Sequence, residues 1–189
     1  MSPPQSLLRV LQRQHAHIAS LTSRVMESVG RERQGAVTDL LQYVALHESA
    51  EQTFMHPVAI RSVGDMSAVQ GRVAEEREIE AVITHLEGLN PDSVDFMIYF
   101  GLLEEALSGH TRAEEEVEAP VLGAVVPDQE IEHMARGLEL VDVWMDPATR
   151  SIDGSMARLP LLPGPAGQVG FGELQRRSLE AFDAVFRLR

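Results

Sequence analysis

The chain has 189 residues, enough for one medium domain with an appendage and a self-sufficient hydrophobic core. Its formal charge of −13 and pI near 4.9 argue against nucleic-acid and anionic-membrane partners. All 16 cationic residues are Arg, which excludes Schiff-base and P-loop lysine chemistry, and the lack of Cys excludes disulfides, thiolate catalysis and Cys-ligated clusters. His and carboxylate side chains therefore remain as the strong metal ligands.

The first residues predict a cytoplasmic protein. Met1-Ser2-Pro3-Pro4 provides no cationic segment followed by an apolar run, as a secretory signal would. No stretch of the chain reaches the length of a membrane span, so we expect no membrane partner.

Four long amphipathic segments are expected before residue 127, joined by short turns. The apolar stripe of the first segment places His15 on the buried face and turns His17 toward solvent. In the third segment Glu76 occupies a core position. Asp92 or Ser93 caps the fourth segment. The predicted spans are residues 6–29, 36–63 after a charged turn at 30–35, 67–89, and a fourth helix carrying 99–121.

One motif occurs twice. His47 and Glu51 are followed by Pro57, and His110 and Glu114 are followed at the same distance by Pro120. A His and a Glu four residues apart lie one above the other on a helix face, about 6 Å apart. Both pairs interrupt an apolar stripe, and an unpaired buried carboxylate costs several kcal/mol, so protons, cationic partners or a metal must accompany them.

These segments predict an all-α fold, an up-down-up-down four-helix bundle with a C-terminal helical extension. The bundle domain is expected over residues 1–126 and the extension over 127–189. The extension is expected to contain an amphipathic helix from Ile131 to Met145, a Pro/Gly-rich loop over 146–170 and a last short helix from Phe171 to Leu188. A lid over the bundle mouth, a homodimer contact and a plain structural extension all remain open for it.

The inward polar side chains come from all four predicted helices, and three imidazoles and three carboxylates are too many for one tetrahedral zinc. Their mixture of nitrogen and oxygen donors suits iron or manganese better than magnesium or calcium. Two metals bridged by Glu51 and Glu114 would account for the whole set. The predicted metal ligands are His15, His47, Glu51, Glu76, His110 and Glu114.

Several neighbouring residues have less certain roles. His56 is a weaker ligand candidate because it lies about 140° round the helix from Glu51. Tyr43 and Tyr99 serve either as core packing, the more frequent role of such residues, or as outer neighbours and electron donors of the site. The acidic run of Glu115, Glu116 and Glu118 is expected to form a solvated face.

With these motifs, the first 126 residues resemble the hemerythrin-like HHE cation-binding family. The matching residues are Gln14-His15, the two HxxxE motifs with their prolines, and Glu75-Glu76. The resemblance implies a non-heme di-iron centre that meets dioxygen, peroxide or nitric oxide, with the HxxxE glutamates bridging the irons.

The chain departs from the family pattern on the third helix. The family normally has Glu-His where this chain has Glu75-Glu76, and hemerythrins proper carry another His where this chain has Arg72. Extra carboxylate should favour the ferric state, and a missing ligand leaves an open coordination position. We therefore expect an oxidase- or oxygenase-type protein acting on dioxygen or peroxide, with a small organic substrate under the extension.

Two other readings remain open. The chain could bind or sense oxygen or nitric oxide, or buffer iron, without turnover. It could also be a structural helical protein whose core polar residues pair with Arg.

Overall fold

The computed structural model describes residues 3–62, 66–146 and 170–187. Within these ranges the chain is helical and forms no strand, which confirms the all-α class for this part of the chain. Among the described helices, none is both long enough and apolar enough to cross a bilayer. The elements are α1 (Pro3–Glu27), α2 (Gly30–Phe54), α3 (His56–Ser62), α4 (Met66–Glu87), α5 (Val94–Ala113), a π-helical turn η1 (Glu114–Glu118), α6 (Ala119–Val125), α7 (Asp128–Met145) and α9 (Phe171–Arg187).

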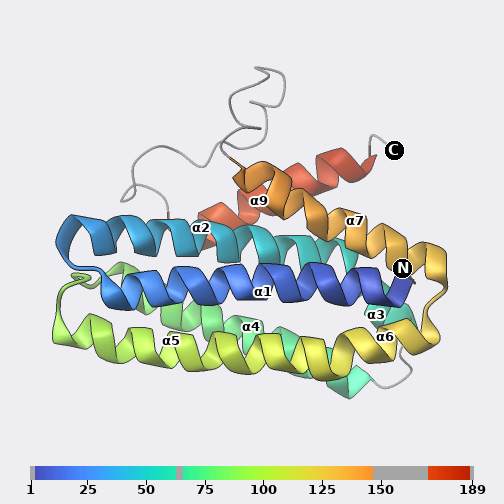
Figure 1. The fold of residues 1–189 in the computed structure, drawn as a ribbon, viewed down its shortest axis with the longest axis horizontal. Helices are drawn as coiled ribbons and strands as arrows, with labels where there is room; N and C mark the ends of the chain where they lie inside the picture. Colours follow the sequence, from blue (N-terminus) through green and yellow to red (C-terminus); the bar gives the residue numbers. More distant parts are fainter. Residues whose placement is uncertain (1–2, 63–65, 147–169, 188–189) are drawn as a thin grey trace.

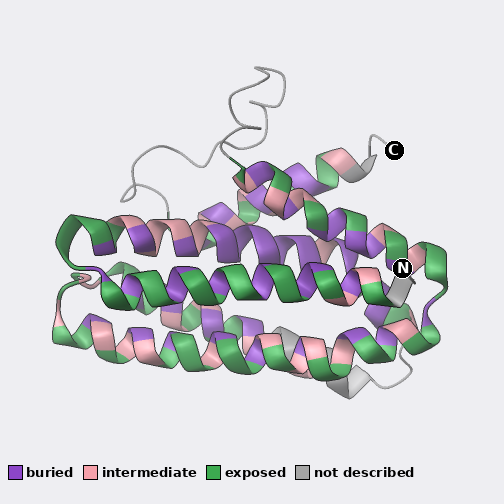
Figure 2. Cartoon of the chain, in the orientation of Figure 1, coloured by how far each residue is buried: buried purple, intermediate pink, exposed green. Residues whose placement is uncertain are grey.

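The long helices α1, α2, α4 and α5 lie side by side and bury their apolar stripes against one another (Figure 1). In α2, every residue from position 43 to 51 is buried, so this part of the helix has no solvent-facing side (Figure 2). The cause is that α2 packs against α1 and also against α7 and α9. The largest fully buried apolar side chains include Leu7, Leu11, Leu40, Tyr43, Ile79, Ile83, Phe96, Phe100 and Leu103.

The expected charged turn at 30–35 is wrong, because α2 already begins at Gly30. Gly30 has a φ of 60°, which lets the chain reverse direction sharply after α1. Its N–H donates to Asp92 Oδ1 at 2.9 Å, and the buried Arg33 donates to Val25 O and to the same carboxylate. Arg33, which was expected in the turn, therefore stabilises the chain reversal from the beginning of α2. Next to Asp92, Ser93 caps α5 by accepting the N–H of Phe96, as expected.

Both prolines that follow the HxxxE motifs stand next to a helix irregularity. The long second helix expected over 36–63 is divided at Met55, two residues before Pro57. In the second copy the π-helical turn begins at Glu114 itself, where the Ala119 N–H donates five residues back to Glu114 O. Proline provides no N–H for the regular ladder, so each irregularity lies where the ladder is weakest.

The C-terminal helices lie along the sides of the long helices. Helix α7 packs against α1 and α2, and α9 packs against α2 and α4 (Figure 1). The last helix was expected from Phe171 and does begin there, whereas most of the expected Pro/Gly-rich loop, residues 147–169, lies outside the described residues. Trp144 of α7 and Phe182 of α9 stack with ring centroids 4.3 Å apart, which joins the two helices.

Close packing of α7 on α2 predicts an effect of one added methyl group. A Cβ at Gly137 would lie 2.3 Å from Cγ of the buried Phe54 ring. We expect Gly137→Ala to lower the free energy of unfolding by about 1–3 kcal/mol, because the ring cannot move without disturbing its neighbours. Gly35→Ala, which meets nothing within 4 Å, is the control and should stabilise by about 0.5–1 kcal/mol. Urea unfolding followed by circular dichroism measures both, and equal effects would contradict this docking.

Candidate metal centre

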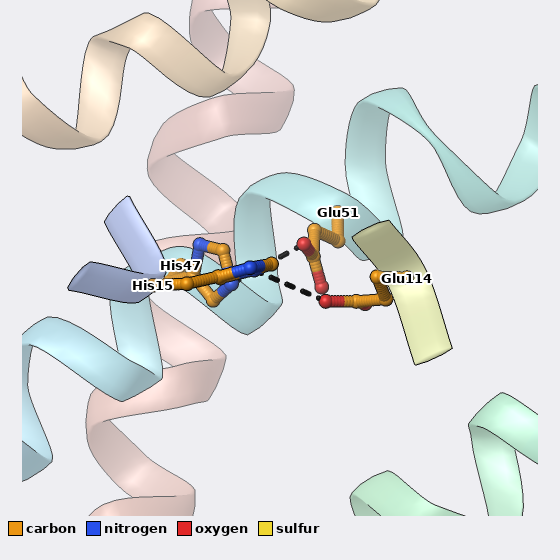
Figure 3. A group of neighbouring side chains, drawn as sticks. All are labelled: His15, His47, Glu51 and Glu114. Atoms are coloured by element: carbon orange, nitrogen blue, oxygen red, sulfur yellow. Dashed lines mark ion pairs between the residues drawn. The ribbon is translucent and has the colours of Figure 1, made fainter. Parts of the chain in front are cut away.

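Buried imidazoles and carboxylates from several helices converge between α1, α2 and α5. His15 comes from α1, His47 and Glu51 from α2, and Glu114 from the π-helical turn, and their polar ends point toward one another in Figure 3. None of these four side chains is more than 6 % exposed. The imidazole rings of His15 and His47 lie edge to face, with centroids 5.1 Å apart, so both can present a nitrogen to the same region.

The ligand atoms form two groups that overlap. In the first, atoms of His15, His47, Glu51 and Glu114 lie within 4.8 Å of one another, and the second contains Glu48, Glu51 and His110. Glu51 therefore belongs to both. In the first group His47 Nε2 lies 3.2 Å from Glu51 Oε1, and His15 Nε2 lies 3.2 Å from Glu114 Oε2.

The other oxygens of these two glutamates face His110. Glu114 Oε1 is 3.1 Å from His110 Nε2, and Glu51 Oε2 is 4.0 Å from it. Glu48 Oε1 lies 3.6 Å from the same nitrogen. Each of the two HxxxE glutamates thus directs one oxygen to an imidazole of each group.

The outer nitrogen of each of the three imidazoles has a partner of its own. His15 Nδ1 lies 2.7 Å from Glu115 Oε1, His47 Nδ1 lies 3.1 Å from Gln14 Oε1, and His110 Nδ1 lies 3.4 Å from Glu75 Oε2. All three partners are oxygen acceptors, so they favour a proton on Nδ1 and leave the Nε2 lone pair directed inward. This is the arrangement that orients histidine ligands toward metals.

The inner atoms are close together but do not form hydrogen bonds. The Nε2 atoms of all three imidazoles and both carboxylate oxygens of Glu51 and Glu114 are buried without a hydrogen-bond partner. A lone pair on Nε2 facing a carboxylate oxygen at 3.1–3.2 Å is repulsive unless a proton or a metal cation lies between them. Two ligand atoms about 2.1 Å from one ion and about 90° apart are separated by about 3.0 Å, which is close to these distances. The residues present therefore fit a metal ion.

The arginines whose side chains the structure describes do not supply that cation. Among the described residues, the arginine ion pairs join acidic residues outside both groups, as in Arg13–Asp142, Arg24–Asp39, Arg33–Asp92 and Arg61–Glu130.

A sequence comparison assigns the family. The family model described as the hemerythrin HHE cation binding domain matches residues 6–141. The chain belongs to this family. No curated protein and no solved structure matches it. The hemerythrin match includes most of α7, beyond the boundary expected at residue 126, and Asp142 lies one residue past its end.

The electrostatics of this hemerythrin-type site describe what the metal-free protein must do. Burial, together with Glu114 and Glu76, raises the pKa of Glu48 to about 8 against the opposing effect of His110. Burial, Glu114 and Glu48 also raise the pKa of Glu51 well above its ordinary value. Burial opposes the charge on His110, but Glu114 and Glu48 outweigh it and raise the pKa of His110 to about 10. Protons therefore take the place of a cation when no metal is bound.

The pKa values of His47 and Glu114 are shifted in the opposite direction. Burial and the neighbouring His15 lower the pKa of His47 to about 3, so this imidazole stays neutral at neutral pH. Burial opposes the charge on Glu114, but His110 outweighs it and holds the pKa of Glu114 well below its ordinary value. A neutral imidazole and an ionised carboxylate are the forms that bind metals.

Glu76, the sixth predicted ligand, is buried but is not brought into either group. Its Oε1 lies 3.2 Å from His56 Nε2, and its Oε2 accepts a hydrogen bond from Gln52 at 2.8 Å. The charge of Glu76 acts on Glu48, so it borders the second group, and its role as a ligand stays a prediction. The side chain of Arg72 lies outside the described residues.

Two residues at the site were missed or undervalued at the sequence level. Glu48 was not predicted, although it stands three residues before Glu51 and so shares one side of α2 with it. Glu115 was expected on a solvated face, which is wrong, because it accepts from His15 at 2.7 Å. Of the same acidic run, Glu116 is exposed as expected, whereas Glu118 is half-buried and acts electrostatically on Glu51.

The tyrosines and the outer histidines make contacts of their own. His17 is exposed, as predicted, and its ring lies 4.5 Å from that of Tyr43. Tyr43 donates its hydroxyl to Asp142 of α7 at 2.9 Å, and burial together with that carboxylate raises its pKa above the ordinary value. Tyr99 is half-buried and packs against the exposed ring of His85, 4.0 Å away.

These pKa shifts predict how the stability of the metal-free protein depends on pH. Between pH 6.5 and 8, folded Glu48 and His110 hold protons that the unfolded chain releases, since both pKa values are raised. The folded state then binds more protons, so the free energy of unfolding should fall by about 1 kcal/mol per pH unit for each group as the pH rises. His47 opposes this slope only near pH 6.5, where the unfolded imidazole is about half protonated while the folded one is neutral.

Urea unfolding in the presence of EDTA at several pH values from 6.5 to 8 measures this slope. Added metal should reverse the trend, because metal binding displaces these protons and strengthens as the pH rises. A metal-free stability that is constant or increasing over this window would contradict the electrostatic description.

Proposed function

We propose that this protein is a non-heme di-iron oxidoreductase that reacts with dioxygen or peroxide. The observation that carries the proposal is the position of Glu51 and Glu114, which each direct one oxygen to each of two ligand groups. The bundle that holds them is proposed to run up-down-up-down. In Figure 1 the direction in which the sequence colours advance alternates from α1 to α2, α4 and α5, which supports this topology.

Two ions, rather than one, balance the charge of the site. Glu48, Glu51, Glu76 and Glu114 are buried and carry four negative charges when ionised. Two divalent cations match that charge, whereas one would leave two buried negative charges uncompensated. The imidazoles contribute no charge when their Nε2 atoms bind metal.

The donor set favours iron, with manganese as the second choice. Imidazole nitrogen together with carboxylate oxygen suits these ions, while magnesium and calcium prefer oxygen alone and structural zinc prefers four ligands. When bound, the two irons would supply electrons to dioxygen or peroxide. Glu48 adds a carboxylate to the second group, and extra negative charge favours the ferric state, so oxidation should proceed rather than reverse.

Small molecules have a route to the centre. A cleft of about 410 Å³ lies between α1 and α5, and His15 forms part of its wall. All the residues that line the cleft belong to α1 and α5, so a small organic substrate is proposed to approach here rather than beneath the extension. The other lining residues include Ala19, Thr22, Ser23, Gly101, Glu105 and Ser108.

Metal content is the first test of the proposal. Protein purified from iron-replete cells should contain about two irons per chain, and Glu51→Gln should contain less than about one, because this carboxylate is shared by both groups. Metal-free Glu51→Gln should be at least as stable as the metal-free parent, since it removes a buried ionisable group. Glu139→Gln, an exposed change on α7, is the control. Zinc in place of iron, or full iron content in Glu51→Gln, would contradict the di-iron site.

Rapid mixing of the diferrous protein with dioxygen or hydrogen peroxide tests the reaction. We expect irreversible conversion to the diferric form, and absorption spectroscopy measures this conversion. A spectrum that reverts when dioxygen is removed would instead identify an oxygen carrier or sensor, and an absence of any reaction would favour an iron buffer.

The cleft is tested with oxidants of two sizes. Ser108→Trp should fill the cleft and lower the rate of oxidation by a bulky organic hydroperoxide at least about tenfold. The rate of oxidation by dioxygen should fall less. Ser20→Trp, on the exposed side of α1, is the matched control. Equal rates in both variants would exclude the cleft as the route.

A further inference from the structure

Gln14 connects the tail helix α7 to a ligand of the proposed metal centre. Its side chain is fully buried on α1, and Nε2 donates to Leu138 O at 2.8 Å and to Asp142 Oδ2 at 3.1 Å. These two acceptors are one helical turn apart on α7. The other end of the amide, Oε1, lies 3.1 Å from His47 Nδ1.

The two acceptors on α7 determine which way the amide faces. Nε2 carries two hydrogens and Oε1 carries none, so the reverse orientation would place an oxygen against a carbonyl and a carboxylate. Oε1 must therefore face His47 and can only accept. This requires the proton of the neutral imidazole to be on Nδ1, which leaves the Nε2 lone pair directed at the ligand group containing Glu51.

Asp142 also accepts hydrogen bonds from two other side chains. Arg13 Nη2 donates to Oδ2 at 2.6 Å, and the buried Tyr43 hydroxyl donates to Oδ1 at 2.9 Å. The carboxylate thus receives hydrogen bonds from α1 and from α2 in addition to that of Gln14. Its position does not depend on Gln14 alone, so it can serve as a fixed reference for the amide.

We propose that Asp142 and Gln14 are positioning residues that hold His47 in its metal-binding tautomer. Helix α7 thereby contributes to the metal centre through Asp142. The effect on metal binding rests on the proposed function, whereas the tautomer is a property of the protein without metal. The two measurements below therefore separate the failure of one from the failure of the other.

Nitrogen-15 NMR of the metal-free protein at neutral pH reports which imidazole nitrogen of His47 carries the proton. The parent should show the proton on Nδ1. In Gln14→Leu that nitrogen loses its acceptor, so the proton should move to Nε2 and donate to Glu51. Asp142→Leu should give a mixture, because Leu138 O still holds one amide hydrogen. Asp142→Asn should restore the parent state, because its oxygen can accept from Gln14 while its amide faces the hydroxyl of Tyr43.

The dissociation constant for Fe²⁺, measured anaerobically by competition with a chelator, is the second readout. We expect it to rise about 10–100-fold in Gln14→Leu, less in Asp142→Leu, and hardly at all in Asp142→Asn. Glu130→Gln, which removes an exposed ion pair of α7 with Arg61, is the control for a general effect on helix docking.

A parent protein with the proton on Nε2, or a Gln14→Leu protein with an unchanged tautomer, would overturn the positioning role whatever its metal affinity. If Gln14→Leu does not fold, the contrast between Asp142→Leu and Asp142→Asn decides the same question. A parent that binds no iron but shows the expected tautomers would overturn the di-iron proposal and leave the positioning role intact.

Discussion

The structure depends on a set of hydrogen-bond acceptors, imidazole nitrogens and carboxylate oxygens, that face one another in the buried interior. Lone pairs of three imidazoles and oxygens of three glutamates meet at 3.1–3.6 Å without hydrogen bonds. Such a group is unstable unless protons or cations occupy the space between its atoms. Two irregular features of the helices lie next to these atoms: the π-helical turn begins at Glu114, and α2 is interrupted one turn after Glu51.

Periodicity could identify four of the proposed ligands because a His and a Glu four residues apart must share a helix face, and the apolar stripe of the first segment identified His15 as a fifth. It could not identify Glu48, because α2 is buried on every side from residue 43 to 51. In a helix without a polar face, the hydrophobic pattern does not show which residues face the site. Glu115 was misplaced for a different reason. The π-helical turn that begins at Glu114 changes the angle between successive residues, so a count at 100° per residue points the wrong way.

Long-range packing accounts for the rest of the difference. The break at Met55 separates His56 from the phase of α2, and this is how His56 meets Glu76 of α4. The contribution of α7 could not be predicted either, because Gln14 and Asp142 are 128 residues apart in the chain. Composition and spacing thus predicted the fold class and most of the residues that the structure brings together in the candidate site, while contacts between distant helices orient these residues.

The two ligand groups are not equivalent, and the cause is the arrangement of the helices. The first combines two imidazoles with the shared glutamates, whereas the second has one imidazole and the additional carboxylate of Glu48, with Glu76 at its border. The second position is therefore the more negative, and an ion there would be held more firmly in a high oxidation state. The first group lies beside the cleft through His15. In the proposed di-iron protein, an incoming molecule would meet the less negative position first, and the two positions would have different roles.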